Sequence, residues 1–121
     1  MCFTNVKRTT DYLRSQTCAI KVFKLLGEDG KSPYRSYQWY YGWNHPQRKA
    51  RKTPLKNYQD AGNGLYVFRR MARAELDRSR YYDEYVAVCW VLPEDIIGAN
   101  SDNILARRVW LGGNPPPHKV R

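Results

Sequence analysis

Cysteine and histidine are scarce in this chain of 121 residues, which limits the chemistry that it can hold. The three cysteines (Cys2, Cys18, Cys89) and two histidines (His45, His118) are scattered, without a Cys-x-x-Cys pair. Such a set argues against a disulfide framework and indicates a reducing compartment. It also lacks the spacing of a zinc site, so we expect neither a metal nor a cofactor.

Long apolar runs are also missing. The most apolar stretch, near residues 86–92, is far shorter than the roughly 18 residues that a membrane span needs. The first residues lack the apolar core of a secretion signal. We therefore expect a cytoplasmic protein that does not contact a membrane.

Acidic residues are absent from residues 31–59. The chain has 21 lysines and arginines against 11 acidic residues, a formal net charge of +10. Residues 1–60 hold 12 of the basic residues and only 4 of the acidic ones. A basic charge concentrated in one half of a chain favours an anionic partner, most often nucleic acid.

Tyrosines and tryptophans are interleaved with this basic charge. Basic groups neutralise phosphates, and aromatic faces stack on unpaired bases, which favours single-stranded nucleic acid or structured RNA over a duplex. The basic run at residues 48–52 would contact phosphates without reading sequence. Alternatively, the aromatic residues fill the core and the run is a solvated loop. The candidate binding residues are Arg35, Trp39, Tyr41, Trp43, Arg48, Lys49, Arg51, Lys52 and Lys56.

Hydrophobic patterning predicts one α+β domain over residues 18–111, after a lead segment (1–17) that holds at most a short helix and before a flexible tail (112–121). The expected fold is a mixed or antiparallel sheet of about five strands with one main helix, residues 69–80, packed on one face. The near-continuous apolar stretch 85–92 indicates a central strand buried on both faces, with Cys89 in the core. The strands are expected at residues 18–26, 34–41, 65–68, 85–92 and 104–111, the first two as a hairpin, with a long loop at 42–64 and a short turn or helix at 93–95.

No catalytic constellation is readable, so we expect no enzyme and assign no catalytic residue. Removal of Met1 would make Cys2 an N-terminal nucleophile, but no oriented base or oxyanion donor accompanies it. Gly62 and Gly64 before a strand would allow a nucleotide phosphate to approach. A turn that relieves backbone strain is the simpler interpretation.

Several short stretches are similar to a known group of sequences. They are Met1-Cys2-Phe3-Thr4, Ile20-Lys21-Val22-Phe23, Ser32-Pro33-Tyr34, Tyr41-Gly42, Gly64-Leu65-Tyr66-Val67-Phe68, Pro93-Glu94-Asp95 and residues 106–111. Together they resemble a loose family of small uncharacterised proteins of bacteriophages and mobile elements. The resemblance implies a phage-encoded accessory or host-takeover role in the host cytoplasm.

The stretch Gly62-Asn63-Gly64-Leu65-Tyr66-Val67-Phe68 also looks like the strand of ADP-ribosyltransferase-type folds that places an aromatic residue below the nicotinamide. That resemblance implies this role for Tyr66. It departs at the first strand, where residues 20–22 offer no histidine, and at the catalytic glutamate, for which the pattern fixes no position and Glu94 is the candidate. Even if the fold matched, we expect a scaffold without the activity.

Three functions remain open from the sequence. The first is a small, basic, non-enzymatic phage accessory protein that binds nucleic acid or a host nucleoprotein complex, including an anti-defence (anti-CRISPR-like) role. The second is a nucleotide-using transferase on a degenerate ADP-ribosyltransferase-like fold. The third is a protein-interaction or virion component.

Overall fold

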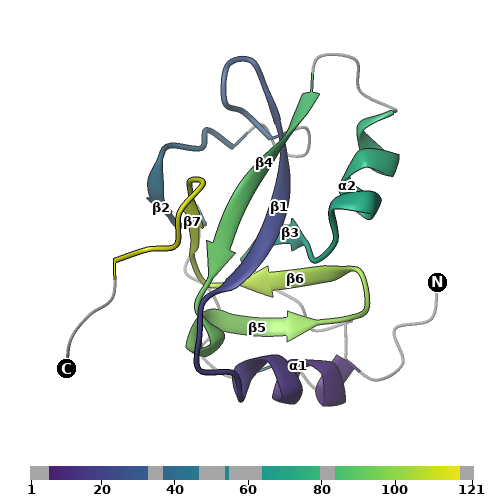
Figure 1. The fold of residues 1–121 in the computed structure, drawn as a ribbon, viewed down its shortest axis with the longest axis vertical. Helices are drawn as coiled ribbons and strands as arrows, with labels where there is room; N and C mark the ends of the chain where they lie inside the picture. Colours follow the sequence, from purple (N-terminus) through teal and green to yellow (C-terminus); the bar gives the residue numbers. More distant parts are fainter. Residues whose placement is uncertain (1–5, 33–36, 47–53, 55–63, 80–83, 118–121) are drawn as a thin grey trace.

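A computed structural model describes residues 6–32, 37–46, 54, 64–79 and 84–117. The described strands form one antiparallel seven-stranded sheet in the order β2-β7-β4-β1-β3-β6-β5 (Figure 1). The helices are α1 (Val6–Arg14), α2 (Met71–Arg78) and the short 3₁₀ helix η2 (Pro93–Asp95). The strands are β1 (Ile20–Gly27), β2 (Gly42–Asn44), β3 (Leu65–Phe68), β4 (Glu84–Val91), β5 (Ile96–Ala99), β6 (Asn103–Ala106) and β7 (Val109–Leu111).

The prediction of a single small α+β domain is confirmed, but the predicted numbers of strands and helices are too small. The described residues contain seven strands and two α-helices, where the sequence predicted about five strands and one main helix. Short strands account for most of the difference. β2, β5 and β7 have three or four residues each, too few for a hydrophobic period to stand out.

The long antiparallel pair β1–β4 forms the middle of the sheet. Its eight residue pairs run from Ile20↔Val91 to Gly27↔Glu84. The expected central position of β4 is confirmed, and Cys89 is fully buried. The prediction that this strand is buried on both faces is wrong, because burial alternates along β4. Ala87, Cys89 and Val91 are buried, and the residues between them are partly exposed.

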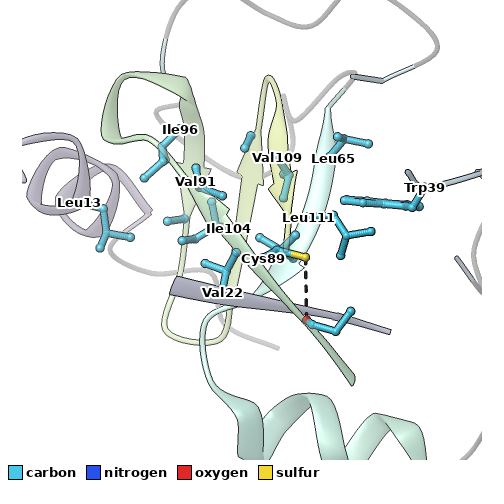
Figure 2. Packing of buried hydrophobic residues seen from close by; sticks show 14 of the residues in the cluster. Leu13, Val22, Trp39, Leu65, Cys89, Val91, Ile96, Ile104, Val109 and Leu111 are labelled. Atoms are coloured by element: carbon cyan, nitrogen blue, oxygen red, sulfur yellow. Dashed lines mark hydrogen bonds between the residues drawn. The ribbon is translucent and has the colours of Figure 1, made fainter. Parts of the chain in front are cut away.

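The buried residues of β4 belong to the core cluster, which lies on one face of the sheet. Every described strand except β2 contributes to it, and Figure 2 shows side chains from β1, β3, β4, β6 and β7 converging there. Trp39 closes the cluster at the end farthest from α1 (Figure 2). The short helix α2 lies on the other side of β1 and β4 (Figure 2). Its Ala74 is buried.

The lead segment is part of the domain from residue 6 onward. α1 packs along the edge strand β5 (Figure 1). Val6, Thr10 and Leu13 recur at helical spacing and form its buried face. The Thr10 hydroxyl donates to the Val6 carbonyl (2.6 Å) and accepts the Ala99 N–H (3.0 Å). α1 therefore covers an edge that would otherwise expose unpaired backbone groups.

The predicted hairpin of residues 18–26 with 34–41 is not formed as a pair of strands. β1 has β4 and β3 as its neighbours, so both of its edges are already occupied. Residues 37–39 return beside the turn through an isolated bridge, Lys31↔Gln38, and the bonds Ser32 N–H to Tyr37 O and Trp39 N–H to Gly30 O, both 2.9 Å. The Gln38 side chain also donates to the Asp29 carbonyl at 2.8 Å. Residues 33–36 lie outside the described part.

The predicted strand 104–111 is two strands in different parts of the sheet. β6 pairs with β3 and β5, and β7 pairs with β4 and β2. Asp95 stabilises the two residues that separate β6 from β7, Arg107 and Arg108. Its carbonyl accepts the Arg107 N–H (2.8 Å), and its carboxylate accepts the Arg108 Nε–H (2.7 Å). The segment 93–99 is likewise η2 followed by β5.

Candidate nucleic-acid interface

Three tryptophans lie directly opposite one another on adjacent strands, and we call them the tryptophan row. In the sheet register Trp43 of β2 pairs with Trp110 of β7, which also pairs with Trp90 of β4. The strand neighbours of Trp90 and Trp110 belong to the core cluster. Because side chains alternate along a strand, the row lies on the opposite face of the sheet. All three side chains are partly exposed.

Contacts within the row hold these rings in place. Trp43 and Trp110 meet edge to face, with ring centroids 5.3 Å apart and planes at 78°. The indole N–H of Trp90 donates to the Gly112 carbonyl at 3.1 Å. Edge-to-face pairs stabilise aromatic contacts beyond the area that they bury. The row is thus a fixed aromatic surface.

Arg108 covers part of this surface. Its guanidinium carbon lies 3.9 Å from the centroid of the Trp43 ring. Its Nε is 2.7 Å from the Asp95 carboxylate, and the two side chains are 28% and 12% exposed. An arginine on an aromatic ring gains from cation–π attraction, and an ion pair removes much of its freedom to rotate. Trp43, Arg108 and Asp95 therefore form one ordered unit.

Further cations surround this unit. Lys21 of β1 is exposed and pairs with Trp90 in the sheet register, which extends the row by one strand. Arg14 and Arg107 both donate to the Glu94 carbonyl of η2, and Arg14 also donates to the Ile96 carbonyl at 2.6 Å. Two guanidinium groups thus meet at the helix that carries Asp95.

A second aromatic feature precedes β2. Tyr40 and Tyr41 are 68% and 87% exposed, on a turn that Gly42 makes possible with a φ of 90°. The buried Asn44 side chain accepts the Tyr40 N–H (2.9 Å) and donates to the Tyr40 carbonyl (2.8 Å) and the Gly42 carbonyl (3.0 Å). Asn44 therefore fixes a turn that presents two tyrosines to solvent.

The core-facing side of the sheet contains an unusual lysine. Lys24 lies between buried residues of β1, donates from Nζ to the Tyr66 carbonyl (2.8 Å) and stands 5.5 Å from the Trp39 ring centroid. Burial lowers the pKa of Lys24 to about 8, an effect opposed by the nearby Cys89 and Glu84. Burial raises the pKa of the Cys89 thiol to about 12, which keeps this cysteine an inert thiol.

The residues predicted to bind have different locations. Trp39 is 4% exposed and belongs to the core cluster, so its ring is not available to a base, and its assignment to the interface is corrected. Tyr41 is highly exposed, and Trp43 lies in the tryptophan row. The predicted basic residues lie outside the described part: Arg35, Arg48, Lys49, Arg51, Lys52 and Lys56.

Sequence reasoning missed Trp90, Trp110, Arg108 and Lys21. One signal was present, because both tryptophans sit between small or branched apolar residues, in Cys-Trp-Val and Val-Trp-Leu. Alternation in a half-buried strand puts such a tryptophan on the face away from its neighbours. Nothing in the sequence, however, pairs β2 with β7 and β7 with β4.

Searches for relatives of the chain found no matching family model, curated protein or solved structure. Within the described residues, no cluster of three His, Cys, Asp or Glu side chains could hold a metal ion. In the same part of the chain, no helix has the length and apolar character to cross a membrane. Tyr66 is partly buried on β3, and Glu94 is exposed on η2.

Proposed function

We propose that this protein binds single-stranded nucleic acid, including the unpaired regions of structured RNA, on the sheet face that carries the tryptophan row. The observation that carries the proposal is the register Trp43–Trp110–Trp90, which places three partly exposed rings side by side on one face. Partly exposed aromatic residues on a sheet face are a common platform for unpaired bases.

The charge of the chain supports the same partner. Lys21 and Arg108 flank the row, and the basic run 48–52 follows β2 in the sequence after only three residues. In this proposal the run, together with Arg35 and Lys56, contacts phosphates, and the rings stack on bases. Phosphate contacts supply most of the affinity of such complexes, and base contacts supply the selectivity.

The binding activity would serve a non-enzymatic accessory role. The resemblance to small bacteriophage and mobile-element proteins favours a role in a host cell, where the target would be a free nucleic acid or a host nucleoprotein complex. An anti-defence role belongs to this class. The proposal needs no cofactor and no catalytic residue.

Replacing Trp43 by leucine tests the platform. Leucine keeps an apolar contact for Trp110 but removes the ring, so the fold should persist while stacking is lost. Stacking on one base contributes roughly 1–3 kcal/mol, so the dissociation constant for a labelled single-stranded oligonucleotide should rise about 5- to 150-fold. Fluorescence anisotropy gives the affinity, and a melting curve reports the fold. Tyr12→Leu is the matched control, because Tyr12 is a 62% exposed aromatic residue on α1.

Equal binding by both variants and the unchanged protein would remove the tryptophan row from the interface. Absence of binding to single-stranded DNA and RNA by the unchanged protein would refute the function itself. An affinity capture from host lysate, with and without nuclease, would then show whether a protein is the direct partner.

A further inference from the structure

We propose that Arg108 recognises guanine, so that the interface prefers single strands in which a guanine reaches Trp43. This inference rests on the proposed function and names a base that the site selects. It starts from the unit of Trp43, Arg108 and Asp95, in which the guanidinium is fixed on two sides.

Arg108 has hydrogen-bond donors that the described residues leave available. The guanidinium of Arg108 lies over the Trp43 ring, and its Nε–H is taken by Asp95. No described residue accepts a hydrogen bond from its two terminal nitrogens. Those nitrogens form a planar fork that matches two acceptors side by side. The O6 and N7 atoms of guanine present such a pair on one edge of a flat ring.

The two terminal nitrogens of Arg108 would also fit two phosphate oxygens, but the nearby carboxylate of Asp95 distinguishes a phosphate from a base. Asp95 lies 2.7 Å from Arg108 and offsets its charge. A phosphate on the fork would place a second anion close to this carboxylate, and the two would repel each other. The edge of guanine is neutral and meets no such repulsion. The ion pair therefore favours a base over the backbone.

The position of the Arg108 guanidinium on the tryptophan row also favours a base. Arg108 rests on a ring of the tryptophan row, which in the proposed function is the surface where bases stack. A ligand that accepts both hydrogen bonds is thereby held next to this ring surface. Asp95 acts here as a positioning residue, because it fixes the direction of the fork and touches no ligand.

The experiment compares a short oligothymidylate with the same oligomer carrying one central guanine. The unchanged protein should bind the guanine oligomer more tightly by roughly 5- to 150-fold, the range of one bidentate arginine–base pair. Arg108→Lys keeps the charge but loses the fork, so the ratio of the two dissociation constants should fall to about one. Replacing the guanine by 7-deazaguanine, which lacks the N7 acceptor, should reduce the ratio in the unchanged protein.

Arg78→Lys is the matched control, since Arg78 also gives its Nε to a carboxylate (Glu75, 2.9 Å) but lies on α2. It should keep the full guanine preference. Equal binding of both oligomers by the unchanged protein would overturn guanine recognition and leave the proposed function standing. The same would follow if Arg108→Lys weakened both complexes but kept their ratio, which is the mark of a phosphate contact. Failure to bind either oligomer would overturn both proposals. The 7-deazaguanine ratio needs no variant, so it decides the question even if Arg108→Lys fails to fold.

Discussion

Lys24 is the residue whose ionisation the fold changes most clearly among the described lysines. Its side chain lies on the core-facing side of β1, where it donates to the Tyr66 carbonyl and stands near the Trp39 ring, with Cys89 and Glu84 also nearby. Burial favours the neutral amine and lowers the pKa from 10.5 to about 8. At neutral pH the folded protein therefore bears the cost of a charge in a poorly solvated place.

We predict that Lys24→Met stabilises the protein at pH 7. Replacing this partly exposed but poorly solvated charge by an apolar side chain of similar length should raise the free energy of unfolding by roughly 1–4 kcal/mol. The gain should be constant below pH 8, where Lys24 is charged in both states, and should shrink as the pH rises towards 10.5. In that window the unfolded chain binds a proton that the folded chain does not, so the unchanged protein gains stability with pH.

Urea unfolding at pH 7 and near pH 10 checks this prediction. Lys21→Met is the control, because Lys21 lies on the same strand but is exposed, and its variant should change little. The raised pKa of Cys89 acts in the opposite direction above pH 9, where the unfolded thiol loses its proton first. That loss of stability occurs in both proteins and largely cancels in the difference. A gain that stays constant up to pH 10 would contradict the account.

At the scale of elements, α1 and β5 depend on each other. β5 is an edge strand, and all four of its residues are buried because α1 lies along it. Thr10 joins the two through its hydroxyl, and Arg14 adds a hydrogen bond to the Ile96 carbonyl. The helix thus satisfies two backbone groups of the edge strand and lies where another chain would otherwise pair.

We predict that Thr10→Val destabilises the protein although it keeps the side-chain shape. The Ala99 N–H would lose its acceptor in a buried place, which costs roughly 1–3 kcal/mol. Urea unfolding followed by tryptophan fluorescence measures the loss. The same replacement at Thr17, which is exposed beyond the end of α1, should change stability by less than about 0.5 kcal/mol. Equal stability of Thr10→Val and the unchanged protein would show that the hydroxyl does not secure this edge.

At the scale of the whole molecule, the excess positive charge lies in the first half of the chain, next to the segment that carries β2. The tryptophan row joins β2 to β7 and β4, from the second half. The sheet thus brings a strand adjacent in sequence to the basic run beside two strands from the half with the smaller net charge. In the proposed function the basic run contacts phosphates, and the tryptophan row, built from strands of both halves, stacks on bases.

We predict that replacing Arg48, Lys49, Arg51 and Lys52 together by alanine weakens binding to all single strands alike. If each contacts one phosphate, the slope of log K against log salt should fall in magnitude by roughly 0.7 per contact, or about 3 in total. If these side chains are solvated, as the sequence predicts, the melting temperature should barely change, because such charges contribute little to stability. A salt titration of oligonucleotide binding measures the slope.

The control replaces Lys7 and Arg8, which are exposed on α1, and should leave the slope nearly unchanged. Trp43→Leu should behave in the complementary way and lower the affinity at a constant slope. An unaltered slope in the quadruple variant would exclude the basic run from the interface.

Much of the fold follows from local patterns in the sequence. β3 has the predicted bounds, and β1, α2 and β4 differ from prediction by two residues or fewer at each end. Each of these elements has a clear pattern of apolar residues, or a run of good helix formers, over four or more residues. Trp43 and Tyr41 could also be named as surface candidates, since they lie beside glycine and within a basic segment. The burial of Trp39 could not be predicted, because aromatic residues of the same segment lie both in the core and at the surface.

The sequence by itself determined the composition of the interface, basic and aromatic, and the strands with long apolar periods. Only the tertiary structure decided which residues meet. Trp43 and Trp110 are 67 positions apart in the chain, and they pair because β1 already has both neighbours and leaves β2 to join the sheet at β7. Likewise Asp95 reaches Arg108 only because η2 and the break between β6 and β7 come together. Pairing between distant strands depends on the competition among all strand edges, which a local pattern does not contain.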